Sequence, residues 1–313
     1  MSLTSIKLFG GQQLLPSKKK SKMLKQEARV AWLFLLPNLV GFLLFVVIPI
    51  IASLILSFYR WDLMSSPSFI GFGNFIRLFN ESSFKTVLIN TVYYTIGTVP
   101  VSMVLGLGLA LLLNRPLKSV TLYRAFFYLP QIIPMVAAGL IFQFMYMPDF
   151  GVINYFLGSL GLPQPNWLND TSTAMIAIIL MSVWKGTGFN MVIYLAGLNG
   201  IPKSYLEASQ IDGANIWQQF RYVTLPLLTP TTFFVLAISV IGSFQIFDPV
   251  YVMTKGGPAD ATRTLVYYIY ETGFQFFRMG KAAAAAWILF VIVFVATLIQ
   301  FKYQERWVTY EQV

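Results

Sequence analysis

The residue types that usually carry enzyme chemistry are scarce in this sequence. It contains no histidine and no cysteine, which excludes Cys or His metal ligands, disulfides and Cys/His nucleophilic pairs. The 12 Asp and Glu residues are spread thinly, and we find no Gly-x-x-x-x-Gly-Lys-Ser/Thr loop for a nucleotide phosphate. We therefore expect no catalytic residue, no metal site and no cofactor in this chain.

Polar side chains do occur inside two strongly apolar stretches, where contact with lipid would be costly. They should face either a cavity or a neighbouring helix, because Ser and Gly are also common where membrane helices pack. Within this set, Lys185 and Asp248 could form an internal ion pair. The residues are Ser182, Trp184, Lys185 and Asn190 in the first stretch, and Ser239, Ser243, Gln245 and Asp248 in the second.

A polar stretch, residues 205–226, carries strong helix-capping signals. Ser204 and Glu207 have the spacing of a capping box, in which the hydroxyl and the carboxylate each bind the other residue's backbone N–H. The helix should stop near Asp212-Gly213, because glycine readily adopts the left-handed conformation of a C-terminal cap. The spacing predicts a short helix that ends in a glycine elbow.

A second capping pattern follows directly, from Asn215 and Gln218. It predicts another short helix, which we expect to end near Leu225-Pro226. The two helices would form a knuckle suited to insertion into a partner. Spacing alone is equally compatible with an ordinary, well-capped loop.

The composition identifies the elements that must hold these residues. The chain has 313 residues, of which 57% are hydrophobic and only 11% charged, whereas soluble domains are about 25% charged. Several apolar runs approach or exceed the ~20 residues that a helix needs to cross a bilayer. The net charge of +10 comes from basic residues dispersed between these runs, so we expect no nucleic-acid partner. The sequence predicts an all-α polytopic membrane protein.

Six membrane-spanning helices fit the apolar runs. Glycines in the second one should allow close helix contact, and the aromatic stretch before the last one could form an interfacial helix. A basic tail, 1–29, precedes the transmembrane domain, 30–305, and a polar tail, 306–313, follows it. The spans lie at about 31–58, 86–113, 125–146, 173–198, 226–253 and 282–303, and the glycines are Gly97, Gly106 and Gly108.

Basic residues also predict the orientation, since they favour the cytoplasmic side. The N-terminal tail carries seven Lys or Arg residues, whereas the loop after the third span, 147–172, carries none. Both termini and the loop 199–225 should therefore be cytoplasmic. The loops 59–84, 147–172 and 254–281 should face outward, although the last carries four basic residues, against the rule.

The knuckle resembles the signature loop of permease subunits of binding-protein-dependent ABC importers. The family pattern is Glu-Ala-Ala, then Gly, then Leu-Pro, and this chain departs from it only at Ser209. Other motifs resemble the carbohydrate-uptake branch, and the resemblance covers roughly residues 30–305. The matching motifs are Glu207-Ala-Ser, Asp212-Gly-Ala, Leu225-Pro226, Trp184-Lys-Gly-Thr-Gly-Phe189, Leu198-Asn-Gly-Ile-Pro202, Phe247-Asp248 and Thr254-Lys-Gly-Gly-Pro258.

This resemblance implies the type I importer permease fold, in a bacterial inner membrane. It implies four partners besides the bilayer: a homologous second permease, two cytoplasmic ATPase subunits and an extracellular solute-binding protein. ATP and Mg²⁺ would be bound by the ATPase subunits. The knuckle would be the coupling helix that docks on an ATPase subunit, through Glu207, Ala208, Ser209, Asp212, Gly213, Ala214, Leu225 and Pro226.

Similarity to maltose-type permeases also implies sugar-contact positions in the fourth and fifth spans. Helix packing is the alternative role for the same residues, and an unpaired Lys185 would favour an acidic sugar. In the outward loops, Trp61, Trp167 and Phe274 would be either binding-protein contacts or interfacial anchors. The sugar-contact positions are Ser182, Lys185, Gly186, Phe189, Ser239, Gly242 and Ser243.

Two other functional classes compete with an ABC permease. A gradient-driven secondary transporter would need titratable groups in the spans, for which Lys185, Asp248 and Asp62 are the candidates. A membrane-embedded enzyme has the weakest support, because histidine and cysteine are absent.

Overall fold

The computed structural model describes residues 22–115 and 118–309, in two units that divide between Ser53 and Leu54. Residues 1–21 of the predicted N-terminal tail lie outside the described residues. The first unit is a helical rod that begins inside this predicted tail: α1 (Lys22–Phe42), a π-helical turn η1 (Leu43–Val47) and α2 (Ile48–Ser57), which crosses the division. Its apolar side chains find no core within the unit, so a stable arrangement needs lipid or protein outside the unit to cover them.

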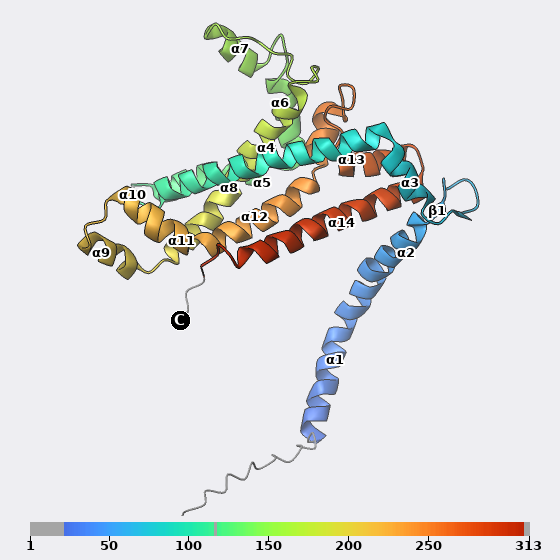
Figure 1. Ribbon diagram of the computed structural model, residues 1–313, viewed down its shortest axis with the longest axis horizontal. Helices are drawn as coiled ribbons and strands as arrows, with labels where there is room; N and C mark the ends of the chain where they lie inside the picture. The colour runs from blue at the N-terminus through green and yellow to red at the C-terminus, as the bar shows by residue number, and fades with distance from the viewer. Residues whose placement is uncertain (1–21, 116–117, 310–313) are drawn as a thin grey trace, which may run out of the picture. The chain divides into compact units, whose positions relative to one another are not determined.

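The second unit is built around four helices that pack side by side: α4 (Ser82–Leu113), α8 (Ala174–Asn199), α12 (Thr229–Phe244) and α14 (Met279–Gln304). The α4 helix contacts both α8 and α12, and α12 contacts α14 (Figure 1). The helices α4, α8 and α14 lie within four residues of the predicted spans at each end.

Two glycines let α4 and α8 approach closely, as the sequence predicted. A Cβ atom on Gly106 would lie 2.6 Å from the Cβ of Asn190, and one on Gly97 would lie 2.7 Å from the Cδ1 of Ile179. Larger residues would push the helices apart. The prediction was wrong for Gly108, whose Cβ would meet no described atom within 4 Å.

The predicted third span is two helices at 94° to each other, α5 (Val120–Ile132) and α6 (Met135–Met145). Proline at position 134 disfavours a helical conformation in the residue before it. Ile133 is accordingly extended, at φ −63° and ψ 128°. The predicted span over 125–146 is therefore not one continuous helix, and the chain turns by about a right angle within this range.

The predicted fifth span is also bent, by 63°. The helix that begins as α10 (Ile216–Gln219) continues through η2 (Phe220–Thr224) and α11 (Leu225–Leu227) before α12 starts. The predicted helix end near Pro226 is thus displaced to the Leu228 joint, where the Thr229 hydroxyl donates to the Pro226 carbonyl at 2.6 Å. The predicted end at residue 253 was wrong, because α12 ends at Phe244 and a separate π-helix, η3 (Val250–Thr254), follows.

Short elements connect these helices. The aromatic stretch is not an exposed interfacial helix as a whole, because Tyr267 and Tyr268 of α13 (Leu265–Tyr270) are buried. Trp167 is half-buried and donates to Asn154 Oδ1 at 2.8 Å. The elements are the antiparallel strands β1 (Tyr59–Arg60) and β2 (Ser68–Phe69), α3 (Gly73–Asn80), α7 (Val152–Ser159), α9 (Lys203–Ile211), α13 (Leu265–Tyr270) and η4 (Glu271–Gln275).

By length and composition, the residues 22–115 and 118–309 contain four helices able to cross a membrane, or six if each bent pair counts as one span. The fold is therefore all-α apart from one two-stranded hairpin, and its six apolar segments match the six predicted spans in number.

Candidate functional site

The first half of the knuckle forms as an isolated helix that ends in a glycine elbow. Gly213 adopts φ +80°, and the N–H of Ala214 donates to the Ser209 carbonyl at 2.9 Å, which closes the C-terminal cap. The capping box at Ser204 was wrong: α9 starts at Lys203 after Pro202, without a side-chain cap. Proline lacks the N–H that a capping box would use at that position.

The second capping box is confirmed. The Asn215 N–H donates to Gln218 Oε1 at 2.8 Å, and the Gln218 N–H donates to Asn215 Oδ1 at 2.9 Å. This exchange satisfies two helix-terminal donors. It fixes the direction in which the chain leaves the elbow towards α11 and α12.

The knuckle exposes both charged and large apolar side chains. Glu207, Ala208, Asp212 and Gly213 are exposed, whereas Ser209, Ala214, Leu225 and Pro226 are half-buried. Sequence reasoning missed three exposed residues beside them, Ile211 (87%), Ile216 (77%) and Trp217 (68%). Their signal was three large apolar residues within a polar loop. Such a patch indicates a partner surface.

An open groove of about 800 Å³ separates the knuckle from the end of α4. Leu206, Trp217 and Phe220 line it from the knuckle, and Leu111 and Arg115 line it from α4 and the residues that follow. The knuckle therefore stands away from the helices behind it, and part of its inner face is accessible.

A polar seam lies between α4, α8 and α12, in the middle of the helical unit. Ser243 donates to Thr95 Oγ1 at 3.1 Å, and Asn190 donates to Ser102 Oγ at 3.3 Å. The buried hydroxyls of Ser182 and Thr98 lie in the same seam, beside the buried Tyr94. The seam therefore collects hydroxyl and amide groups that are able to hydrogen-bond a polar group.

The other predicted sugar-contact positions lie on the same helix faces. Gly186 and Phe189 follow Ser182 at helical spacing on α8, and a Cβ on Gly186 would lie 3.9 Å from Ser102. Ser239 and Gly242 precede Ser243 on one face of α12, where Gly242 borders open space. By helical spacing, six of the seven positions therefore lie on the faces of α8 and α12 that carry Ser182 and Ser243.

Lys185 is the exception, because it points to the break between α5 and α6. Its ammonium donates to the carbonyls of Pro130 (3.0 Å), Gln131 (3.2 Å) and Ile133. Helix ends leave carbonyls without partners, and a cation there also interacts favourably with the helix dipole. The predicted ion pair between Lys185 and Asp248 is therefore wrong for the residues that the structure describes. The alternative prediction, an unpaired Lys185 that faces a substrate path, is also wrong, because the ammonium has three carbonyl partners.

These features match a known family of membrane proteins. Residues 102–309 match the family model described as binding-protein-dependent transport system inner membrane component. The chain belongs to this family. The permease is 41% identical over 298 residues to the probable ABC transporter permease protein YesP of Bacillus subtilis (strain 168), covering 94% of this chain and 96% of the relative.

Two further similarities concern proteins whose cargo is named. The permease is 38% identical over 276 residues to the lactose transport system permease protein LacF of Rhizobium radiobacter, covering 86% of this chain and 92% of that protein. A chain from the crystal structure of a bacterial alginate ABC transporter, in complex with an alginate pentasaccharide-bound periplasmic protein, superposes with a TM-score of 0.80. The sequence of that chain is 25% identical to this one, and the match covers 91% of this chain and 98% of the alginate transporter chain.

Family membership and the shared fold confirm several predictions from the sequence. The chain is a membrane transport permease with the type I importer permease fold. The family it belongs to is one of membrane components and not of enzymes.

Proposed function

We propose that this permease is one of two homologous membrane chains of an ATP-driven importer for a carbohydrate. The observation that carries the proposal is the exposed knuckle, in which Glu207 and Asp212 flank an apolar surface around Gly213. Two ATPase subunits would bind ATP and Mg²⁺, since this sequence has no phosphate loop. Closure of the ATPase dimer would then move the knuckle and, through it, the spans.

The chemistry of the knuckle supports docking on a protein. Ala208, Ser209 and Ala214 are small, so a partner surface can approach the helix closely, while Ile211 and Trp217 supply apolar area. Glu207 gives the surface a charge that a basic residue of the ATPase would pair with.

A carbohydrate cargo fits both the seam and the relatives. Hydroxyl and amide groups of Ser182, Ser243 and Asn190 would exchange hydrogen bonds with sugar hydroxyls, and Phe189 offers an aromatic face. The named cargoes of the relatives are lactose and an alginate oligosaccharide, which points to the same class of compound here.

The charge asymmetry supports an orientation with both termini and the knuckle in the cytoplasm of a bacterial cell. The loops 59–84, 147–172 and 254–281 would then face an extracellular solute-binding protein that delivers the sugar. The binding protein in the alginate complex is described as periplasmic.

Uptake into vesicles tests the coupling role. Glu207→Ala and Gly213→Leu should each lower ATP-driven uptake of labelled lactose or alginate oligosaccharide by at least about tenfold, while the ATPase subunits still co-purify. Matched controls are Glu305→Ala, an exposed acid elsewhere, and Gly161→Leu, a glycine with positive φ (69°) in another loop. Full uptake by the knuckle variants, with the ATPase bound, would refute the proposal. Uptake that needs no ATP but collapses with an uncoupler would favour a gradient-driven transporter.

A further inference from the structure

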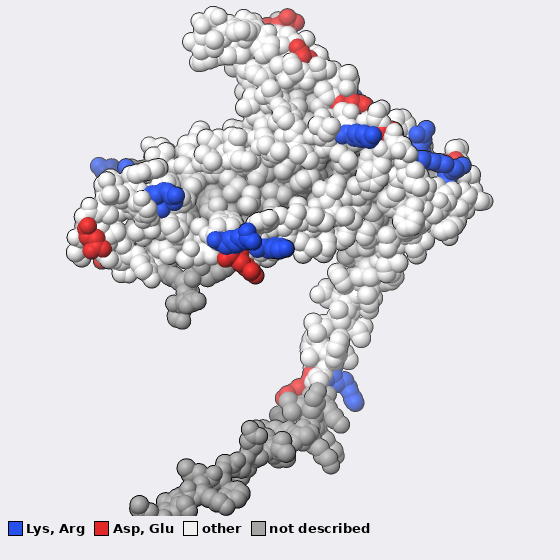
Figure 2. All heavy atoms as spheres, viewed as in Figure 1, with Lys and Arg blue, Asp and Glu red and all other residues white. Residues whose placement is uncertain are grey.

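A cationic pocket of about 290 Å³ lies at the end of the helical unit opposite the knuckle. Figure 2 shows Lys and Arg side chains gathered at this end, near β1 and α3, and none over the middle of α14. Four basic residues from distant parts of the sequence line the pocket: Arg60, Arg77, Arg278 and Lys281.

The pocket is held by a rigid junction of three segments. Asn74 of α3 is buried, and its amide donates to the carbonyls of Ser57 and Tyr59, each at 2.8 Å. The start of α14 presses on the same strand, because a Cβ on Gly280 would lie 1.8 Å from the Tyr59 carbonyl oxygen. The positions of Arg60, of Arg77 and of the first turn of α14 are therefore fixed relative to one another.

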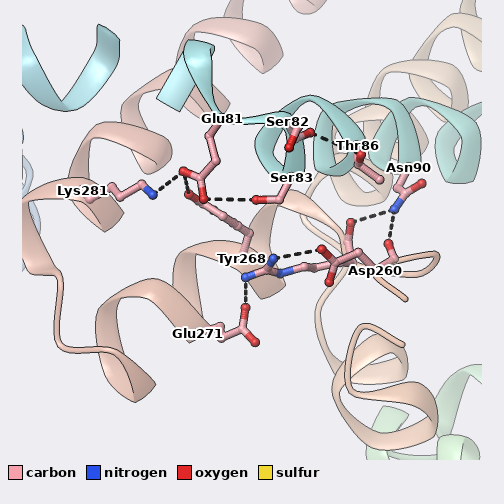
Figure 3. Close-up of polar contacts among 10 residues, drawn as sticks. Glu81, Ser82, Ser83, Thr86, Asn90, Asp260, Tyr268, Glu271 and Lys281 are labelled. Atoms are coloured by element: carbon pink, nitrogen blue, oxygen red, sulfur yellow. Dashed lines mark hydrogen bonds and ion pairs between the residues drawn. The ribbon is translucent and has the colours of Figure 1, made fainter. Parts of the chain in front are cut away.

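Most of the positive charge in the pocket is unpaired. Lys281 forms an ion pair with Glu81, which also accepts from Tyr268 at 3.3 Å (Figure 3). By contrast, the three arginines have no acidic partner among the residues that the structure describes. The one acid in the lining, Asp62, accepts hydrogen bonds from the N–H and hydroxyl of Ser65 at 2.8 and 2.6 Å. The pocket therefore favours an anion.

An apolar groove of about 420 Å³ lies on the same helices, α3 and α14. All of its lining residues are apolar, including Phe75 and Phe79 of α3 and Ile288 and Ile292 of α14. Along α14, Lys281 and Ile292 are eleven residues apart, which corresponds to roughly 16 Å of helix. The cationic and apolar sites thus follow each other along one helix, from the end of the bundle towards its middle.

The short helix α3 also has the character of a membrane-surface helix. Its exposed apolar side chains are those of Phe72, directly before the helix, and of Ile76 and Phe79 within it. They are 67%, 60% and 52% exposed, and Arg77 lies beside them. An amphipathic helix of this kind lies where headgroups meet acyl chains. A soluble anion would use the arginines but would leave this apolar face and the groove uncovered.

We propose that α3 and the first half of α14 bind one anionic phospholipid. Its phosphodiester headgroup lies among Arg60, Arg77 and Arg278, and one acyl chain lies in the groove beside Phe79 and Ile288. The lipid holds α3 against α14 at the end of the bundle where both helices meet β1.

Native mass spectrometry of the detergent-purified transporter, supplied with phosphatidylglycerol and phosphatidylcholine, tests the headgroup site. Arg77→Gln/Arg278→Gln should retain phosphatidylglycerol roughly ten- to thirtyfold less well, because each basic residue contributes about fivefold at an anionic lipid. The matched control Lys85→Gln/Lys255→Gln removes two exposed charges outside the pocket and should bind within about twofold of wild type. Wild-type retention by the arginine variant would overturn the proposal.

A second pair of variants tests the acyl chain. Val291→Trp fills the groove and should also lower phosphatidylglycerol retention, whereas Val295→Trp, one turn further along α14 and outside the groove lining, should not. Inorganic phosphate should fail to displace the lipid. Displacement by phosphate, together with no effect of Val291→Trp, would identify a soluble-anion site and overturn the proposal. Unchanged lipid retention with loss of binding-protein docking in the arginine variant would identify a protein contact instead.

Discussion

Replacing Lys185 by methionine should loosen the right-angle break between α5 and α6. Methionine keeps the apolar stem of the side chain but removes the ammonium that bonds the carbonyls of Pro130, Gln131 and Ile133. Interhelical hydrogen bonds in membrane proteins contribute about 0.6 to 1.7 kcal/mol each. Three of them give a destabilisation of about 2 to 5 kcal/mol, and Lys185→Arg should lose less because it keeps the charge.

Two measurements check this prediction. The first is the unfolding free energy in detergent, compared with Lys118→Met, which removes an exposed lysine with no hydrogen-bond partner among the described residues. The second is the distance between spin labels at Phe126 of α5 and Phe144 of α6, which are 67% and 70% exposed. The distribution of distances between the two labels should broaden in Lys185→Met but not in Lys118→Met. A stability loss below about 1 kcal/mol with an unchanged distance would show that the break does not depend on this side chain.

Three further predictions concern other parts of the second unit. Gly280→Ala should destabilise the chain by about 1 to 3 kcal/mol, because the new Cβ would overlap a carbonyl of β1. Gly108→Ala should cause no such loss, since its Cβ would meet no described atom within 4 Å, and thermal unfolding of the two variants checks the difference. Burial would raise the pKa of Glu81, but the hydrogen bond and charge of Lys281 outweigh it and hold the pKa below its ordinary value of 4.5. This carboxylate contributes its full stabilisation above pH 4.5, and the contribution is lost as the pH falls through the lowered pKa. The free energy of unfolding of Glu81→Gln should therefore depend less on pH in this range than that of the wild type. Equal pH slopes for the two proteins would contradict the assignment. Asn215→Ala should cost about 0.5 to 2 kcal/mol and speed amide exchange in α10, and unchanged exchange would refute the capping role.

Hydropathy predicted the long helices well, because length and apolar content decide whether a helix can span lipid. It could not predict the 94° break, since a hydropathy pattern carries no direction. Pro134 was visible in the sequence, but membrane helices often tolerate proline. Here Ile133 is extended, and the carbonyls of Pro130, Gln131 and Ile133 accept hydrogen bonds from Lys185.

The site was predictable where it depends on local sequence. Gly213 and the Asn215–Gln218 exchange follow from spacing alone, whereas the partner of Lys185 depends on the break and could not be chosen. The cationic pocket was not predicted at all. Arg60, Arg77 and Arg278 come together only because Asn74 and Gly280 hold three distant segments on one strand.

The second half of the knuckle, Ile216–Leu227, and α12 meet at Leu228 at an angle of 63°, so they can act as the two arms of a lever. The arm Ile216–Leu227 is roughly 17 Å long, and the arm from Thr229 to Ser243 is roughly 21 Å. If both arms turn rigidly about the joint, a rotation of about 5° imposed at the knuckle displaces Ser243 by about 2 Å. That displacement exceeds what the 3.1 Å hydrogen bond between Ser243 and Thr95 can accommodate. A small turn of the knuckle would thereby be converted into an exchange of hydrogen-bond partners in the polar seam between α4, α8 and α12.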